Sequence, residues 1–161
     1  MGGQRALSRG KNDFYEYLYT SLSARITRNG VTGRMIVDKR DLKGEHSHLP
    51  AYSKTCDLYF YPGANGLAKQ AKLYRKGRMV LDFDWDHPHH NIRKNGEGES
   101  FPIGVIHVQE YVVTKIKNPK TGKFIDKFIR RSNNARLMTE AEIEKYGELI
   151  HYFNPYVKFR P

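Results

Sequence analysis

The chain has 161 residues, enough for one domain with a hydrophobic core but short for two. Hydrophobic residues make up 39% of the chain, which excludes a wholly disordered chain. The sequence has no apolar run of about 18 residues, which excludes a membrane-spanning helix. The net charge of +11 favours a polyanionic partner, such as nucleic acid, an acidic protein or an anionic membrane surface; a basic surface without a dedicated partner is the alternative.

Residues 1–12 are small and basic, and we expect a loose segment there ahead of a single domain over residues 13–161. Asp13–Arg25 repeats apolar residues at helical spacing, which predicts an amphipathic helix. A short strand is predicted at Arg34–Val37 and a loop at Asp41–Lys54.

The β-prone segment Thr55–Tyr61 predicts a strand. Its Cys56 is the single cysteine, so no intrachain disulfide exists, and we expect a packed thiol rather than a nucleophile. Pro62–Gly66 is a strong turn signal that ends the strand.

The clearest hairpin of the sequence has a predicted three-residue loop, Arg75–Gly77, in which the glycine takes the left-handed conformation. This loop pairs Tyr74 with Arg78 and Lys72 with Val80. One face is then mostly apolar: Ala71, Leu73, Met79, Leu81, Phe83 and Trp85. The other is mostly polar: Gln70, Lys72, Tyr74, Arg78, Val80, Asp82 and Asp84. A two-residue loop would mix polar and apolar groups on both faces, so the longer loop is preferred.

His87–Ser100 is predicted to be a polar loop. Two strands are predicted at Ile103–Lys117 and Phe124–Arg131, joined by a turn. A capping box at Thr139 opens a helix that ends near Phe153. The order predicts an α+β domain: an N-terminal helix, a twisted antiparallel sheet of four to six strands, and a C-terminal helix packed on one face, with the other face open.

Cations and carboxylates share the polar face of the predicted hairpin. Lys72 and Arg78 are suited to bind phosphate, the guanidinium as a bidentate fork and the ammonium as a point charge. The alternative is cross-strand ion pairing with Asp82 and Asp84. Phosphate binding and ion pairing can both occur, because carboxylates often orient catalytic cations.

Histidines follow this face at once, with His87, His89 and His90 in the loop and His107 on the next strand. Cleavage of single-stranded RNA needs a base for the 2′-hydroxyl group, an acid for the leaving oxygen and cations for the charge on phosphorus. Histidine suits both proton roles because its ordinary pKa lies near neutrality. We expect His107 and one loop histidine, His87 or His90, to transfer protons; a packed structural histidine is the alternative for His107.

The spacing Asp82-x-Asp84-x-Asp86-His87 offers a second chemistry, because alternation along a strand puts the carboxylates on one face. With the imidazole they could hold a divalent metal ion for phosphodiester hydrolysis. The spacing matches no strict metal signature. We therefore favour metal-independent chemistry, with no metal site and no cofactor, over a metal-dependent nuclease.

The tract from Lys115 to Arg136 is strongly basic, which indicates a groove that follows a nucleic-acid backbone. Tyr111 and Phe128 are candidates for base stacking. The predicted nucleic-acid-binding residues are Lys69, Gln70, Lys115, Lys117, Lys127, Arg130 and Arg131. A soluble hairpin with ordinary lysines is the alternative.

The run Lys69-Gln70-x-Lys72-x-Tyr74, then Gly77-Arg78, then Asp82-x-Asp84, a histidine-rich loop and a strand histidine, resembles the C-terminal toxin modules of bacterial polymorphic toxins. The resemblance covers residues 55–110, roughly a third of the chain. Many such modules are ribonucleases of the broad barnase, colicin and RelE-like type, with a helical N-terminal part, an antiparallel sheet and no required metal.

Carried over position by position, the resemblance assigns the site to Lys69, Gln70, Lys72, Tyr74, Arg78, Asp82, Asp84, His87 and His107. The second histidine or tryptophan of the family pattern is missing from His107-Val108-Gln109. His90 or Glu110 must substitute for it, or the domain is not an active nuclease. The resemblance also implies an acidic immunity protein that covers the basic face.

The sequence thus predicts a toxin-type ribonuclease that cleaves RNA, with tRNA as one candidate, by metal-independent acid–base transphosphorylation. Lys72 and Arg78 would stabilise the phosphorane-like transition state, Tyr74 would position the substrate, and Asp82 and Asp84 would orient the cations. A bacterium would secrete or deliver the protein, which would act in the target-cell cytoplasm. The rival prediction is a non-enzymatic basic module of a phage or mobile element that binds nucleic acid or protein.

Overall fold

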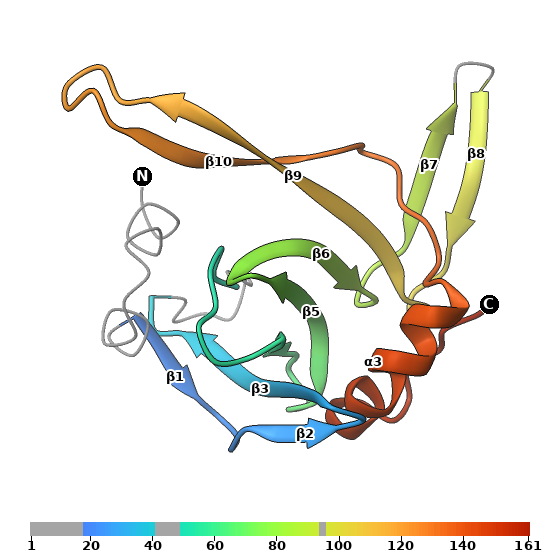
Figure 1. Cartoon of the computed structure of the whole chain (residues 1–161). Coiled ribbons are helices and arrows are strands. Elements are labelled where there is room, and N and C mark those ends of the chain that lie inside the picture. Colours follow the sequence, from blue (N-terminus) through green and yellow to red (C-terminus); the bar gives the residue numbers. More distant parts are fainter. Residues whose placement is uncertain (1–17, 41–48, 94–95) are drawn as a thin grey trace.

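The computed structural model describes residues 18–40, 49–93 and 96–161 (Figure 1). Among these residues, strand accounts for 50% and helix for 11%, so the sheet dominates the architecture. The elements are β1 (Tyr19–Ser21), β2 (Ile26–Arg28), β3 (Val31–Asp38), β4 (Leu58–Pro62), β5 (Ala68–Arg75), β6 (Arg78–Asp84), β7 (His89–Arg93), β8 (Gly96–Phe101), β9 (His107–Lys117), β10 (Phe124–Arg130) and α3 (Glu140–Phe153).

The main sheet has eight strands, with the order β1-β3-β4-β5-β6-β9-β10 and β2 also paired to β3. The pairing of β3 with β4 is parallel, and the other pairings in this sheet are antiparallel. Strands β7 and β8 form a separate two-stranded sheet. Figure 1 shows the β7–β8 and β9–β10 hairpins extending away from the curved body of the sheet.

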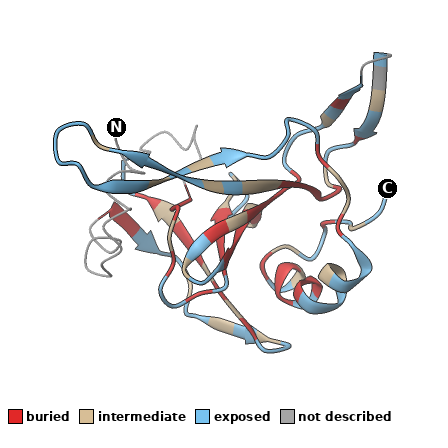
Figure 2. Ribbon diagram, turned by 45° about the horizontal axis from the view of Figure 1, so that its top comes forward, coloured by how far each residue is buried: buried red, intermediate tan, exposed pale blue. Residues whose placement is uncertain are grey.

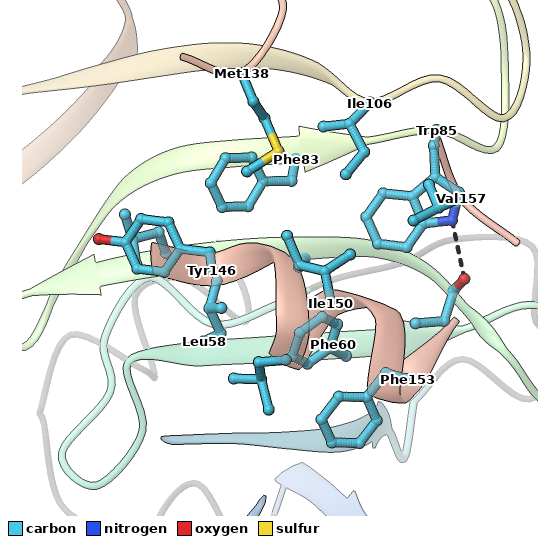
Figure 3. Close-up of a cluster of buried hydrophobic side chains, with 14 of the residues drawn as sticks. Leu58, Phe60, Phe83, Trp85, Ile106, Met138, Tyr146, Ile150, Phe153 and Val157 are labelled. Atoms are coloured by element: carbon cyan, nitrogen blue, oxygen red, sulfur yellow. Dashed lines mark hydrogen bonds between the residues drawn. The ribbon is translucent and has the colours of Figure 1, made fainter. Parts of the chain in front are cut away.

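The principal hydrophobic core lies between α3 and one face of the sheet (Figure 3). The rings of Phe60 and Phe153 stack there with their centroids 4.3 Å apart. The indole N–H of Trp85 donates a hydrogen bond to the carbonyl of Ala68 (3.0 Å), so its polar atom is satisfied inside the core. The helix lies directly on β3, because a Cβ atom at Gly33 would come within 2.9 Å of a Leu149 methyl group.

A second cluster of buried side chains covers the opposite face of the sheet, which the sequence predicted to be open. Its members are Leu18, Tyr19, Ile36, Leu49, Ala51, Cys56, Tyr59, Tyr61, Tyr74 and Met79. Tyr111 and Phe128 of the β9–β10 hairpin pack against it. Both faces of the sheet are therefore covered near its centre, and Cys56 is a packed thiol, as expected.

The predicted α+β layout is wrong, because the sheet is mixed and larger than the expected four to six antiparallel strands. Strand β1 lies within the helix predicted at Asp13–Arg25, and Tyr19 pairs there with Asp38. The hydrogen-bonding edge of β3 outweighed the helical spacing of the apolar residues. Residues 13–17 of that predicted helix, like the predicted loose segment 1–12, lie outside the described residues.

The predicted register of the β5–β6 hairpin is also wrong. Arg75 pairs with Arg78 across a two-residue turn, in which Lys76 (φ 51°) and Gly77 (φ 78°) are both left-handed. The register then shifts between Leu73 and Tyr74, so that Leu73 pairs with Leu81. This bulge leaves one extra residue on β6 and restores the segregation of polar and apolar side chains that the short turn would otherwise break.

The histidine-bearing segment predicted to be a loop instead forms the β7–β8 hairpin. The C-terminal helix is confirmed, and the Thr139 and Glu142 side chains form both hydrogen bonds of its capping box. After the helix, the backbone of Lys158 accepts a hydrogen bond from Ile106 N (2.9 Å) and donates one to Gly104 O (2.8 Å). The chain end near Lys158 thus fixes the segment that enters β9.

Candidate functional site: a histidine–aspartate cluster beside a buried ion-pair network

Two rows of side chains cross the sheet from β4 to β9 at directly paired positions. The first row consists of Tyr59, Lys72, Asp82 and Gln109. The second row consists of Tyr61, Gln70, Asp84 and His107. Strand alternation puts both rows on the face opposite α3. The structure therefore brings together four of the predicted catalytic residues: Lys72, Asp82, Asp84 and His107.

The first row is a closed network around Asp82. The Lys72 ammonium lies 2.6 Å from one carboxylate oxygen, and an Arg130 N–H donates to the other (2.9 Å). The Tyr111 hydroxyl donates to the same carboxylate (2.7 Å) and accepts from Lys72 (3.0 Å). Burial alone would lower the pKa of Lys72, but the charge of Asp82 and the Tyr111 hydroxyl raise it above its ordinary value. Lys72 is thus a buried, fully engaged cation.

The second row ends in the histidine–aspartate cluster, defined as Asp84, His87 and His107. One potential ligand atom from each residue lies within 4.8 Å of the other two. Asp84 closes β6 and His107 opens β9, so both sit on the sheet, and His87 follows three residues after Asp84. His107 is 0% exposed, whereas the His87 side chain is 54% exposed. The cluster therefore meets solvent through His87.

Burial dominates the electrostatics of the two sheet residues of the cluster. It raises the pKa of Asp84 to about 6, and the neighbouring charge of Asp82 adds to this effect. It lowers the pKa of His107 to about 4, with further contributions from His87 and His89. The Val105 backbone opposes this lowering of the pKa, but His107 is still neutral at pH 7, and neither ring nitrogen forms a well-aligned hydrogen bond within the described residues.

Aromatic rings surround the His107 imidazole. The ring centroids of His87 and His89 each lie 5.1 Å from it, and Phe101 stacks on it at 6.1 Å. The Nε2 atom of His89 is also buried without a hydrogen-bond partner in the part of the chain that the structure describes. Asn91 anchors β7 through two 2.7 Å hydrogen bonds to the backbone of Ala135.

Two predicted catalytic residues lie away from the cluster. Arg78 pairs with Asp126 of β10 (Nε to Oδ2, 3.2 Å), which also accepts a hydrogen bond from the Tyr52 hydroxyl (2.8 Å). The buried Tyr74 hydroxyl donates to the backbone carbonyl of Pro50 (2.6 Å). Tyr74 is thus part of the second hydrophobic cluster, and Arg78 is paired with β10 rather than with the histidines.

The other predicted histidine and aspartate residues do not belong to the cluster. His90 is exposed and its Nδ1 atom contacts the Ser100 hydroxyl. Asp86 is exposed and lies 3.7 Å from His87, while Asp82 is committed to its two cations. The three aspartates therefore do not form one carboxylate site.

The cations predicted to bind nucleic acid lie mostly on the β9–β10 hairpin, which Figure 2 shows to be largely exposed. Lys117 and Lys127 are exposed there, and Lys115 pairs with Asp126. Arg131 pairs with Glu110 at the longer distance of 3.5 Å. One face of the hairpin also carries an exposed apolar ladder that the charge pattern did not indicate: Val112, Ile116, Ile125 and Ile129.

Three further predicted nucleic-acid-binding residues lie against the body of the sheet. Arg130, whose side chain is 44% exposed, also donates to the Gln109 side chain (2.6 Å). Lys69 lies over the Tyr61 ring (5.9 Å), and Gln70 is half-buried in the second row. Arg130 thus contacts the first row through Asp82 and Gln109, and its charge lowers the pKa values of both Asp84 and His107.

No family model, curated protein or solved structure matches this chain. Within the described residues, the structure contains no helix that is both long and apolar enough to cross a membrane.

Proposed function

We propose that the protein is a ribonuclease that binds RNA along the β9–β10 hairpin and cleaves it at the histidine–aspartate cluster. The observation that carries the proposal is the exposed His87 imidazole beside the buried pair of Asp84 and His107. Arg130 extends from the hairpin to Asp82 and Gln109 in the neighbouring row, and its charge is felt by Asp84 and His107, so it is the cation proposed for the phosphate.

The residue roles differ from those expected from the sequence. Lys72 is buried, and Arg78 is paired with Asp126 away from the cluster. In this proposal the half-exposed Arg130 therefore stabilises the negative charge of the transition state. In a metal-independent reaction, the exposed His87 would take the proton of the 2′-hydroxyl group and return it to the leaving oxygen, while the His107 ring packs beside it with the centroids 5.1 Å apart. This proton transfer requires that no metal ion occupies the cluster.

The hairpin supplies the binding surface in this proposal. Lys117 and Lys127 are exposed cations on adjacent strands, and backbone phosphates are the groups that such lysines bind without sequence preference. An acidic immunity protein would fit the same surface by charge. The toxin role, the choice of tRNA and the delivery of the protein into a target-cell cytoplasm have the sequence resemblance as their sole support.

The test is to incubate the purified protein with total RNA and with tRNA. We expect cleavage by the wild-type chain and at least a 100-fold lower rate for His87→Ala, whose site is exposed, with RNA affinity retained. His151→Gln is the matched control, because His151 lies on α3 and bonds to the Val157 carbonyl, outside the cluster. Intact RNA under all conditions would refute the ribonuclease.

A non-enzymatic RNA-binding module is the second candidate. The closed network around Asp82 favours it, because Lys72 and Arg130 already have partners and the hairpin cations need no histidine to bind RNA. This candidate predicts RNA binding without cleavage. It also predicts an affinity that His87→Ala leaves unchanged and that the double substitution Lys117→Ala, Lys127→Ala weakens.

A further inference from the structure

We infer that the histidine–aspartate cluster is a binding site for a divalent first-row transition-metal ion of the zinc type. Asp84, His87 and His107 each direct one ligand atom to a common point, with all three atoms within 4.8 Å of one another. Two imidazoles and one carboxylate form a donor set that suits Zn²⁺ and its neighbours in the first row better than Mg²⁺ or Ca²⁺. Small movements of the side chains close the three atoms around one ion.

The buried state of His107 is the independent observation that points to a ligand. This residue is 0% exposed, and apart from an interaction with the Val105 backbone, its ring nitrogens have no well-formed hydrogen bond among the described residues. A buried polar atom without a partner costs about 1–3 kcal/mol, and native proteins rarely leave one so. A metal ion at the cluster takes the lone pair of one ring nitrogen and removes that cost.

Within the part of the chain that the structure describes, Asp84 also lacks a partner, in its case a cation. It is 8% exposed, and none of the ion pairs among the described residues includes it. Asp82, two positions earlier on the same face, has Lys72 and Arg130 as partners. A buried carboxylate is normally paired with a cation or coordinated to a metal. A bound dication gives Asp84 the counter-charge that Asp82 already has.

The scaffold is suited to a metal ion. Asp84 and His107 are directly paired on β6 and β9, so the sheet sets their separation. His87 lies on the exposed connection after β6, where its Nδ1 atom lies 3.1 Å from the Pro88 carbonyl oxygen and its Nε2 atom 3.7 Å from Asp86, so local contacts must be exchanged when it closes on the ion. His89 is the nearest further donor, since its ring lies 5.1 Å from that of His107 and its Nε2 atom is buried without a described partner. Three ligands leave a coordination position for water or a phosphate oxygen.

The metal site does not depend on the proposed ribonuclease activity. It also differs from the metal site considered from the sequence spacing, because Asp82 and Asp86 are not ligands. A bound ion occupies lone pairs of His87 and His107 that metal-independent proton transfer would need. The ion would instead activate a water molecule or polarise the phosphate.

The experiment titrates Zn²⁺ alone into the chelator-treated full chain by competition with a chromophoric chelator, and then records the visible absorption of the Co²⁺ form. We expect one ion per chain and a tetrahedral or five-coordinate Co²⁺ spectrum. His87→Ala and His107→Gln should each weaken Zn²⁺ binding by at least about 100-fold. The control His151→Gln should bind as the wild-type chain does, because His151 bonds to Val157 instead.

His87→Ala decides the test even if His107→Gln fails to fold, because the His87 side chain is exposed. A wild-type chain that binds Zn²⁺ no more tightly than His87→Ala overturns the metal site. Tight Zn²⁺ binding in a chain that leaves RNA intact confirms the site and refutes only the ribonuclease.

Discussion

Lys72 and Asp82 face each other across β5 and β6, and the lysine Nζ atom lies 2.6 Å from the aspartate Oδ1 atom. Both residues are buried, at 9% and 4% exposure. Lys72 could bind a phosphate only by breaking this buried ion pair, which would leave Asp82 with Arg130 and the Tyr111 hydroxyl as its partners. The pair therefore holds the sheet together beside the cluster.

Replacing Lys72 by methionine should lower the free energy of unfolding by about 1–3 kcal/mol, because Asp82 loses the buried ammonium group but keeps Arg130 and the Tyr111 hydroxyl as partners. Urea denaturation at neutral pH measures this loss. The control Lys145→Met changes an exposed lysine of α3 and should cost less than about 0.5 kcal/mol. Equal stabilities of the two variants would contradict the structural role of Lys72.

The hairpin cations should set the salt dependence of RNA binding. Removing two phosphate contacts from a single strand lowers the slope of log K against log salt by about 1.4, at about 0.7 for each charge. We expect this for Lys117→Ala with Lys127→Ala in a filter-binding or anisotropy titration. The double variant Lys54→Ala, Lys145→Ala removes two exposed lysines elsewhere and should keep the wild-type slope.

The β5–β6 turn should respond in opposite directions to two neighbouring substitutions. Gly77→Ala puts a methyl group at a φ of 78°, with a Cβ atom 3.2 Å from the Ser53 carbonyl oxygen, and should destabilise the protein by about 1–2 kcal/mol. Lys76→Asn creates the Asn-Gly pair that this turn prefers and should be neutral or stabilising. Thermal and urea denaturation compare the two, and a stable Gly77→Ala variant would argue against the two-residue turn.

Glu142 should contribute to stability in a way that depends on pH. Burial alone would raise its pKa, but the hydrogen bonds from Arg136 and the Thr139 backbone lower it below its ordinary value of 4.5. Because the folded-state pKa is depressed, the contribution is present above pH 4.5 and is lost as the pH falls through the lower folded value.

Glu142→Gln should therefore reduce the free energy of unfolding at pH 7 by about 1–2 kcal/mol, since it removes the charge that pairs with Arg136 but leaves an oxygen to accept from the Thr139 N–H. The deficit should shrink when urea denaturation is repeated near pH 3. Glu148→Gln, an exposed position on α3, provides the comparison. A Glu142→Gln deficit that stays constant with pH would exclude the ionised pair as its source.

Local signals in the sequence located α3 but not the pairing of the strands. Thr139 and Glu142 correctly predicted the start of α3, because a capping box depends only on residues three positions apart in the sequence. The bulge at Leu73 in the β5–β6 hairpin depends on how both strands pack across the whole sheet, so the hydrophobic pattern alone suggested the wrong turn. Strand β1 exists because of β3, which no local pattern around Tyr19 reveals.

For the candidate site too, local sequence patterns indicated some features and missed those that depend on strand pairing. Alternation correctly put Lys72, Asp82 and Asp84 on one face, but it did not indicate that this face is covered. The contact of Arg130 with Asp82 joins residues 48 positions apart and depends on the pairing of β9 with both β6 and β10. His89 received no role of its own, although its position between His87 and His90 was visible in the sequence.

The attachment of Lys158 to the start of β9 imposes an order on biosynthesis. Ile106 precedes its partner Lys158 by 52 positions, and Val108 precedes its partner Arg136 by 28. A ribosome must therefore translate and release most of the described chain before His107 is held from both sides. Nascent chains that already contain every histidine of the cluster still lack the backbone contacts of Gly104 and Ile106 until Lys158 has been synthesised.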